Sequence, residues 1–231
     1  MIKFTFYGHA CFLIETAGKK LLFDPFISGN EAAKNIDVKK IEADYIFVSH
    51  GHGDHTADLL EIAKNTGALC VAPAEISYWL QANGITNVHG MNHGGPINFD
   101  FGTARGVQAV HSSSLGDGTY AGNPMGFVFN TKDGNFYYAG DTALTMDMQL
   151  IPRWSKLDFC IMPIGGNFTM DADDAIEACR FVKCNEVVGI HYDTFSPIKI
   201  DTKEAIEKFK KAGMHLMLPK IGETIDIKTS S

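Results

Sequence analysis

The chain has 231 residues, of which 45% are hydrophobic and 20% charged, and its formal net charge is −7. This composition is ordinary for a globular protein, and the length allows a substantial buried core. The acidic balance argues against nucleic acid as the main partner, because binding to the phosphate backbone favours a basic surface.

Two other classes of protein are disfavoured by the sequence. No apolar run reaches the roughly 20 residues needed to span a bilayer, and the N-terminus lacks a signal-peptide pattern. The cysteines are odd in number and scattered, so we expect them to be small buried hydrophobic residues in a reducing, cytoplasmic protein. They are Cys11, Cys70, Cys160, Cys179 and Cys184.

The N-terminal half begins with strand patterns. Alternating and apolar runs predict strands over 2–7, 10–15, 20–23 and 45–48, with a hairpin turn at 17–19. Apolar residues at helical spacing then predict helices over 56–65 and 74–83, separated by a strand over 69–72.

The middle of the chain is rich in strand patterns, and its C-terminal part alternates between the two kinds of element. We predict strands over 99–110, 121–131, 135–139, 157–162, 186–190 and 215–218, and helices over 171–182 and 202–212. This mixture indicates one compact α/β domain over 1–231, in which helices cover the sheets. The pattern leaves open whether there are one or two sheets.

A dense cluster of metal-ligating residue types directly follows the predicted strand over 45–48. Its members are His50, His52, Asp54 and His55. Imidazole and carboxylate groups suit zinc, iron, manganese or nickel. Gly51 and Gly53 lack a Cβ, so we expect both to let the loop fold tightly around one point. The cluster therefore predicts a metal centre at the carboxyl end of a strand.

A centre with two metals about 3.5–4 Å apart needs further ligands from distant segments, including a bridging group. His111, Asp141 and His191 each follow a predicted strand. A polar residue at the end of a single strand is often only a turn residue. The shared position and ligand chemistry of all three make them candidates for the missing ligands.

These residues resemble the metallo-β-lactamase superfamily. The cluster matches its His-x-His-x-Asp-His signature, and the three distant residues match its later ligand motifs in order and approximate spacing. Further segments resemble one branch, the metal-dependent hydrolases near the ascorbate-6-phosphate lactonases and the N-acyl-phosphatidylethanolamine phospholipases. They include Phe6–Phe12, Ala121–Pro124, Gly140–Leu144, Pro163–Gly166 and His191–Phe195.

The resemblance implies a four-layer αββα sandwich with two divalent metal ions at one edge of its sheets. It also implies that His50, His52 and His111 hold the first metal, that Asp54, His55 and His191 hold the second, and that Asp141 bridges them. We expect zinc, with manganese, nickel and iron as alternatives.

Two metals would lower the pKa of bound water, so a bridging hydroxide is the expected nucleophile. We take Asp54 and His9 as the candidate catalytic side chains, although His9 could instead be a buried, hydrogen-bonded core histidine. We expect Asp24 to accept a hydrogen bond from a ligand histidine. His93 is interpreted as an exposed loop residue.

The sequence thus predicts a hydrolase that cleaves a small-molecule lactone, ester, amide or phosphodiester. One alternative is a nuclease or phosphodiesterase that acts on nucleic acid with the same site. Another is a di-iron redox or metal-binding protein. A homo-oligomer is compatible with the sequence.

Overall fold

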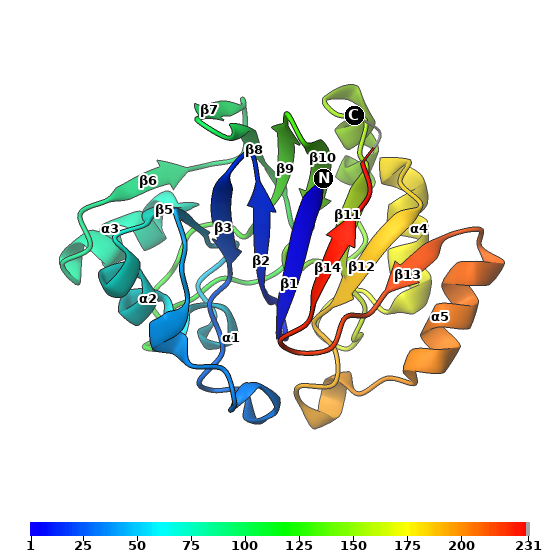
Figure 1. Ribbon diagram of the computed structural model, residues 1–231, viewed down its shortest axis with the longest axis horizontal. Helices are drawn as coiled ribbons and strands as arrows, with labels where there is room; N and C mark the ends of the chain where they lie inside the picture. The colour runs from blue at the N-terminus through cyan, green and yellow to red at the C-terminus, as the bar shows by residue number, and fades with distance from the viewer. Residues whose placement is uncertain (230–231) are drawn as a thin grey trace.

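The computed structural model describes residues 1–229, which form two seven-stranded sheets packed face to face (Figure 1). In spatial order, the first sheet contains β14 (Thr224–Ile227), β1 (Ile2–Gly8), β2 (Cys11–Thr16), β3 (Lys19–Phe23), β4 (Tyr45–Phe47), β5 (Leu69–Pro73) and β6 (Val88–Met91). The second contains β13 (His215–Met217), β12 (Glu186–Ile190), β11 (Phe159–Pro163), β10 (Gly134–Tyr138), β9 (Met125–Thr131), β8 (Gly102–Gln108) and β7 (Ile97–Phe99).

Helices cover the outer face of each sheet (Figure 1). The first sheet packs against α2 (Leu59–Thr66) and α3 (Ala74–Ala82), and the second against α4 (Ala172–Val182) and α5 (Thr202–Lys211). A single-turn helix α1 (Gly53–Thr56) and the 3₁₀ helices η1 (Glu31–Ala33), η2 (Val38–Lys40), η3 (Met146–Arg153) and η4 (Ser196–Ile198) lie in the connections. The predicted αββα sandwich is confirmed, and the number of sheets is two.

The space between the sheets is filled mainly by aromatic rings. Phe47 on β4 is fully buried, and its ring centroid lies 5.4 Å from that of Phe23, 5.5 Å from Phe127 and 4.9 Å from Phe129. Phe127 and Phe129 belong to the second sheet, so these contacts join the two layers. Burial of such large apolar side chains on both inner faces stabilises the sandwich.

Both sheets combine antiparallel hairpins with parallel strands. In the first sheet β3, β4, β5 and β6 run parallel, and in the second β10, β11, β12 and β13 do so. Parallel strands require crossover connections, which brings their carboxyl ends to a common edge. The segments that follow β3, β4, β10 and β12 therefore meet at one edge of the sandwich.

The structure departs from the predicted elements where local signals are weak. The predicted strand over 99–110 is two strands, β7 and β8, with a turn at Asp100–Phe101. The predicted helix over 56–65 is interrupted before α2, where the buried Asp58 carboxylate accepts backbone N–H groups from Ile27 and Ser28. The edge strands β6 and β14 were not predicted, because each depends on pairing with one neighbouring strand, β5 and β1, respectively.

The interpretation of His93 as an exposed loop residue is wrong. Its side chain is half-buried, and Nε2 donates to the Pro124 carbonyl oxygen at 3.0 Å. In residues 1–229, no helix combines the length and apolar character needed to cross a membrane.

Truncation of Phe47 should show how much the aromatic layer contributes to stability. We expect Phe47→Ala to lower the free energy of unfolding by about 3–5 kcal/mol, because it leaves a cavity between the sheets. Urea unfolding followed by circular dichroism measures this change. Tyr78→Ala is the control, since Tyr78 is 68% exposed; an equal loss in both variants would contradict the prediction.

Candidate metal centre

All seven residues predicted as metal ligands converge at the common edge of the two sheets. His50 and His52 lie in the loop after β4, and Asp54 and His55 lie in α1. The other three follow β8, β10 and β12, respectively: His111, Asp141 and His191. The second sheet thus brings three distant donors to the cluster that follows β4.

The donor atoms form two main groups. The nitrogen atoms of His50, His52 and His111 lie within 4.8 Å of one another. The donors of Asp54, His55, His191 and His9 form the second group under the same limit. The composition of both groups agrees with the two ligand sets that the family resemblance implies, except that His9 joins the second.

Asp141 lies between the two groups. Its Oδ2 is 3.0 Å from His191 Nε2 and 3.3 Å from His55 Nε2. The same oxygen is 3.6 Å from His111 Nε2 and 4.0 Å from His50 Nε2. One carboxylate therefore faces members of both groups, as a bridging ligand must.

The buried donors fit divalent cations. Asp141 Oδ1, His55 Nε2 and His191 Nε2 are buried and form no hydrogen bond of good geometry in the described part of the chain, although both ring nitrogens approach Asp141 Oδ2. Leaving such atoms unpaired costs about 1–3 kcal/mol each. His50 Nε2 and His52 Nδ1 also approach within 3.0 Å of each other. Metal coordination would satisfy these atoms.

Electrostatics favour the ligating protonation state of three histidines and of Asp141, whereas Asp141 and Asp24 raise the pKa of His55 well above its ordinary value, against the effect of burial. Burial lowers the pKa of His50, His52 and His111, which keeps these imidazoles neutral. Burial would raise the pKa of the Asp141 carboxyl, but His55 and His191 beside it hold that pKa well below its ordinary value. Neutral imidazole and ionised carboxylate are the forms that bind metals.

Asp24 orients two of these histidines, His55 directly and His50 through Ser49. Its buried Oδ2 accepts a hydrogen bond from His55 Nδ1 at 2.8 Å and from the Ser49 hydroxyl at 2.6 Å. The Ser49 oxygen in turn lies 2.9 Å from His50 Nδ1. The contact with His55 agrees with the expectation for Asp24, and it leaves Nε2 of His55 directed at Asp141.

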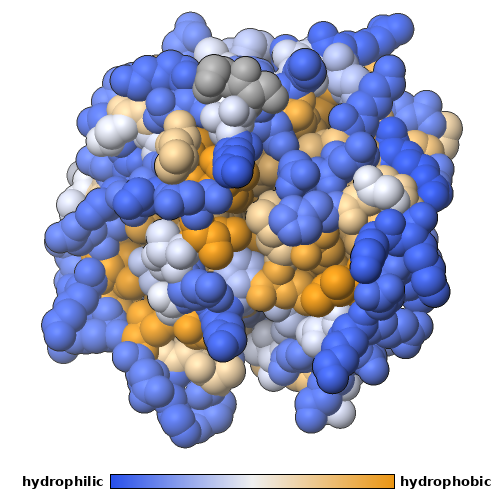
Figure 2. All heavy atoms as spheres, turned by 45° about the vertical axis from the view of Figure 1, so that its right-hand side comes forward, coloured by the Kyte–Doolittle hydropathy of each residue, from blue (hydrophilic) through white to orange (hydrophobic). Residues whose placement is uncertain are grey.

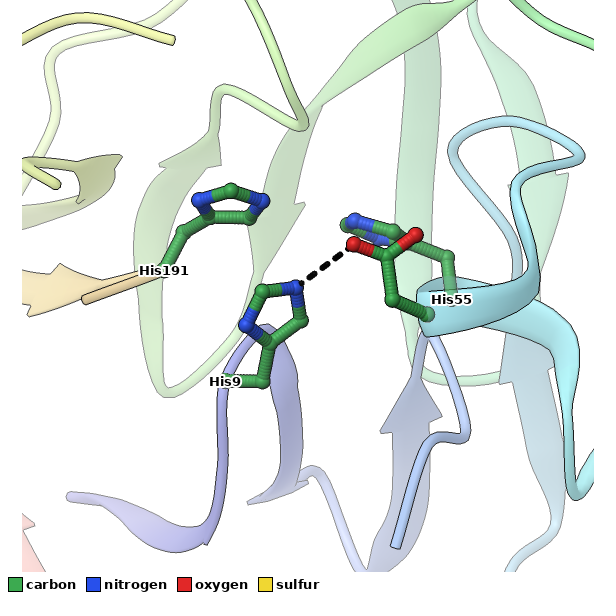
Figure 3. Close-up of side chains that lie close together, drawn as sticks. His9, His55 and His191 are labelled. Atoms are coloured by element: carbon green, nitrogen blue, oxygen red, sulfur yellow. Dashed lines mark hydrogen bonds and ion pairs between the residues drawn. The ribbon is translucent and has the colours of Figure 1, made fainter. Parts of the chain in front are cut away.

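His9 belongs to the β1–β2 turn, and Figure 3 shows its ring beside His191 and facing α1. Nε2 of His9 is 3.1 Å from Asp54 Oδ2, and Nδ1 is 2.9 Å from the Thr194 hydroxyl. Burial lowers the pKa of His9 to about 4, against the opposing effect of Asp54. His9 is therefore a neutral side chain that contacts Asp54.

Three site residues adopt left-handed backbone conformations that non-glycine residues rarely take. The φ angles are 55° at His9, 41° at Asp24 and 56° at His191. Such conformations cost about 1–3 kcal/mol each and persist only where the surroundings enforce them. The backbone around the centre is therefore held by its tertiary contacts.

The two glycines of the cluster differ in their surroundings. A Cβ on Gly51 would lie 2.3 Å from the Ala121 Cβ, whereas a Cβ on Gly53 would have no atom within 4 Å. The lack of a Cβ is therefore sterically necessary at Gly51 but not at Gly53. Gly51 is needed because another segment packs directly against it.

Several further polar side chains contact the site residues. The hydroxyl of Tyr138, which belongs to the second sheet, donates to Asp24 Oδ2 at 2.5 Å. The Thr194 hydroxyl is hydrogen-bonded to His9 Nδ1. Ser112 Oγ lies 3.2 Å from His52 Nε2, and Ser113 Oγ accepts the Gly51 N–H. A hydroxyl inside an apolar or loop segment gives no local signal of the partner it will meet.

Comparisons with known proteins agree with this geometry. The β-lactamase superfamily domain matches residues 3–191. A metal-dependent hydrolase of Flavobacterium johnsoniae is 53% identical over 98% of this chain and all of its own length. One of Methylacidiphilum infernorum is 45% identical over 97% of this chain and 99% of its own. The solved structure of a metallo hydrolase from Ignicoccus hospitalis has a TM-score of 0.87 and 33% identity, with 97% of each chain covered.

The two glycines offer a matched pair of substitutions. Gly51→Ala should lower the bound metal content severely, because the new methyl group displaces the loop that carries His50 and His52. Gly53→Ala should keep the metal and fold with equal or greater stability. Elemental analysis of the purified variants tests this, and similar metal contents in the two would refute the role given to Gly51.

Asp24→Asn should weaken zinc binding about tenfold to a hundredfold, because an amide cannot accept all of the hydrogen bonds that the carboxylate accepts. Competition with a chromophoric chelator measures the affinity. Asp58→Asn is the control, since Asp58 is another buried carboxylate whose partners are backbone and hydroxyl groups of residues 27–28. Equal losses of zinc affinity in both variants would mean that Asp24 acts only through stability.

Proposed function

This chain belongs to the metallo-β-lactamase superfamily and is a metal-dependent hydrolase, and we propose that it uses a dinuclear centre to cleave a small-molecule lactone, ester, amide or phosphodiester. The observation that carries the proposal is the convergence of donor atoms on Asp141, with His50 and His111 on one side and the buried His55 and His191 on the other. An isolated structural carboxylate would have protein donors on its free oxygen instead.

We propose that His50, His52 and His111 hold one metal ion, that Asp54, His55 and His191 hold the other, and that Asp141 bridges them. Zinc suits these nitrogen and oxygen donors, as do manganese, nickel and iron. When bound, two such ions supply a nucleophilic water near neutral pH and stabilise negative charge on the attacked group.

The role we propose for His9 is to position Asp54. An ionised carboxylate can only accept, so Nε2 of His9 holds a proton directed at Asp54 Oδ2, and Nδ1 is free to accept from Thr194. The His9 side chain has no exposed surface, whereas that of Asp54 is 31% exposed. A substrate would therefore meet Asp54, whose orientation His9 controls.

The residues on the exposed side of the centre favour a small-molecule substrate with apolar groups. Of the proposed ligands, His52, Asp54 and His111 are only partly buried. The loops that carry proposed ligands also expose large apolar side chains, which favour an apolar ligand over a polyanion. These are Val110, Tyr120 and Phe195.

Loss of one ligand should remove both metal and activity. We expect His52→Ala to lose most of its bound metal and all detectable hydrolysis in a screen of lactones, phosphodiesters and acyl esters. Wild-type protein stripped with a chelator should lose the same activities and regain them with zinc or manganese. Two metal ions per chain in the wild type would support the dinuclear centre.

His215→Ala is the matched control, because that histidine is exposed and pairs with Glu186 away from the centre. Unchanged metal content in the His52→Ala variant would contradict the ligand assignment. Redox activity with bound iron, in the absence of any hydrolysis, would favour the di-iron alternative.

A further inference from the structure

A cavity of about 520 Å³ adjoins the metal centre. This volume lies in the range of small-molecule binding sites, about 300–1,000 Å³. Its apolar walls come from β1, α5 and the connection between β13 and β14, and include Phe6, Ile206, Leu218, Pro219 and Ile221. Figure 2 shows hydrophobic residues gathered at the centre of one face, where the surface is hollowed between hydrophilic margins.

One side of this cavity borders the metal centre, and His9 belongs to both. His9 and Thr194 both line the cavity, and they are hydrogen-bonded to each other at 2.9 Å. The His9 ring centroid is 4.1 Å from that of His191, and His9 Nε2 contacts Asp54. A molecule in the cavity would thus end one side chain away from the proposed metal ligands.

One cation and one anion, Lys220 and Asp193, line the cavity. Lys220 lines the cavity and is exposed, and its ammonium group forms no ion pair with any residue in 1–229. The Lys220 backbone N–H donates to Glu223 Oε2 at 2.7 Å, which holds the loop in place. Asp193 also lines the cavity, and its Oδ1 accepts the backbone N–H of Ile200 at 3.0 Å.

One apolar side chain at this site lacks a packing role. Ile206 lies on α5, is 40% exposed and faces the cavity instead of the core, to which its neighbour Ala205 contributes. Exposed apolar surface inside a cavity of this size is typical of a binding site.

We propose that the cavity binds the part of the substrate that is not cleaved: an apolar body with an anionic group that pairs with Lys220. The inference rests on the proposed function, because it assigns the cavity to the substrate that the metal centre hydrolyses. It narrows the substrate class to amphiphiles with a hydrolysable group and an anionic group.

Straight-chain alkyl carboxylates from butanoate to decanoate are suitable probes, and calorimetry with the full, metal-loaded chain measures their affinity. We expect Kd to fall about fourfold for each added methylene until the cavity is filled. Ile206→Asp should raise the Kd of decanoate at least tenfold, whereas the apolar control Ile206→Leu should not. A Kd that is independent of chain length or unaffected by Ile206→Asp would overturn the proposal.

Lys220→Gln tests the pairing with the anionic group. It should weaken carboxylate binding about twofold to fivefold, as expected for an exposed charge, and leave binding of the matching 1-alkanols unchanged. Lys199→Gln is the control, since Lys199 is exposed but does not line the cavity. Equal effects of the two substitutions would refute the role of Lys220.

Two further measurements separate this inference from the proposed function. A carboxylate can also ligate a metal, so binding is repeated with the metal-deficient His52→Ala variant. Binding retained there supports the cavity whatever the enzyme hydrolyses, whereas binding lost with the metal overturns it. Once an ester that the enzyme hydrolyses has been identified, decanoate is tested as an inhibitor of that hydrolysis. Competitive inhibition supports a substrate site, and non-competitive inhibition refutes it.

Discussion

The candidate metal centre depends on one buried carboxylate. Asp24 has no exposed surface and accepts hydrogen bonds from the Ser49 backbone and hydroxyl, from His55 and from Tyr138. An ionised carboxylate in the interior costs several kcal/mol unless its lone pairs are used. The four bonds meet that requirement and, in doing so, lock together the end of β3, the loop after β4, helix α1 and strand β10 of the opposite sheet.

This constraint divides the centre into a rigid inner side and an open outer side. The inner residues His9, Asp24 and His191 have left-handed φ angles, which only a fixed surrounding can maintain. The outer residues His52 and Asp54 are partly exposed. The packed sheets thus fix the positions of the proposed ligands, whereas the loops determine how a substrate reaches them. This arrangement is common in enzymes built on packed sheets.

Much of the fold and of the candidate site could be predicted locally. The strands β1 to β5 and the helices α4 and α5 have apolar periodicity, and the cluster after β4 has an unusual density of donors. Predictions failed where the cause is non-local: β6 and β14 exist because a neighbouring strand pairs with them. Tyr138 was likewise missed, because its hydroxyl gains a partner only when the sheets pack.

The sequence by itself determined which donor residues are available and which element each follows, since these depend on residue type and short-range periodicity. Only the tertiary structure decided how the donors group around Asp141, that Gly51 but not Gly53 is sterically required, and that His9 joins Asp54 to a cavity under α5. The reason is that His50, Asp141 and His191 lie far apart along the chain. Their distances depend on strand register and sheet packing, which no local pattern encodes.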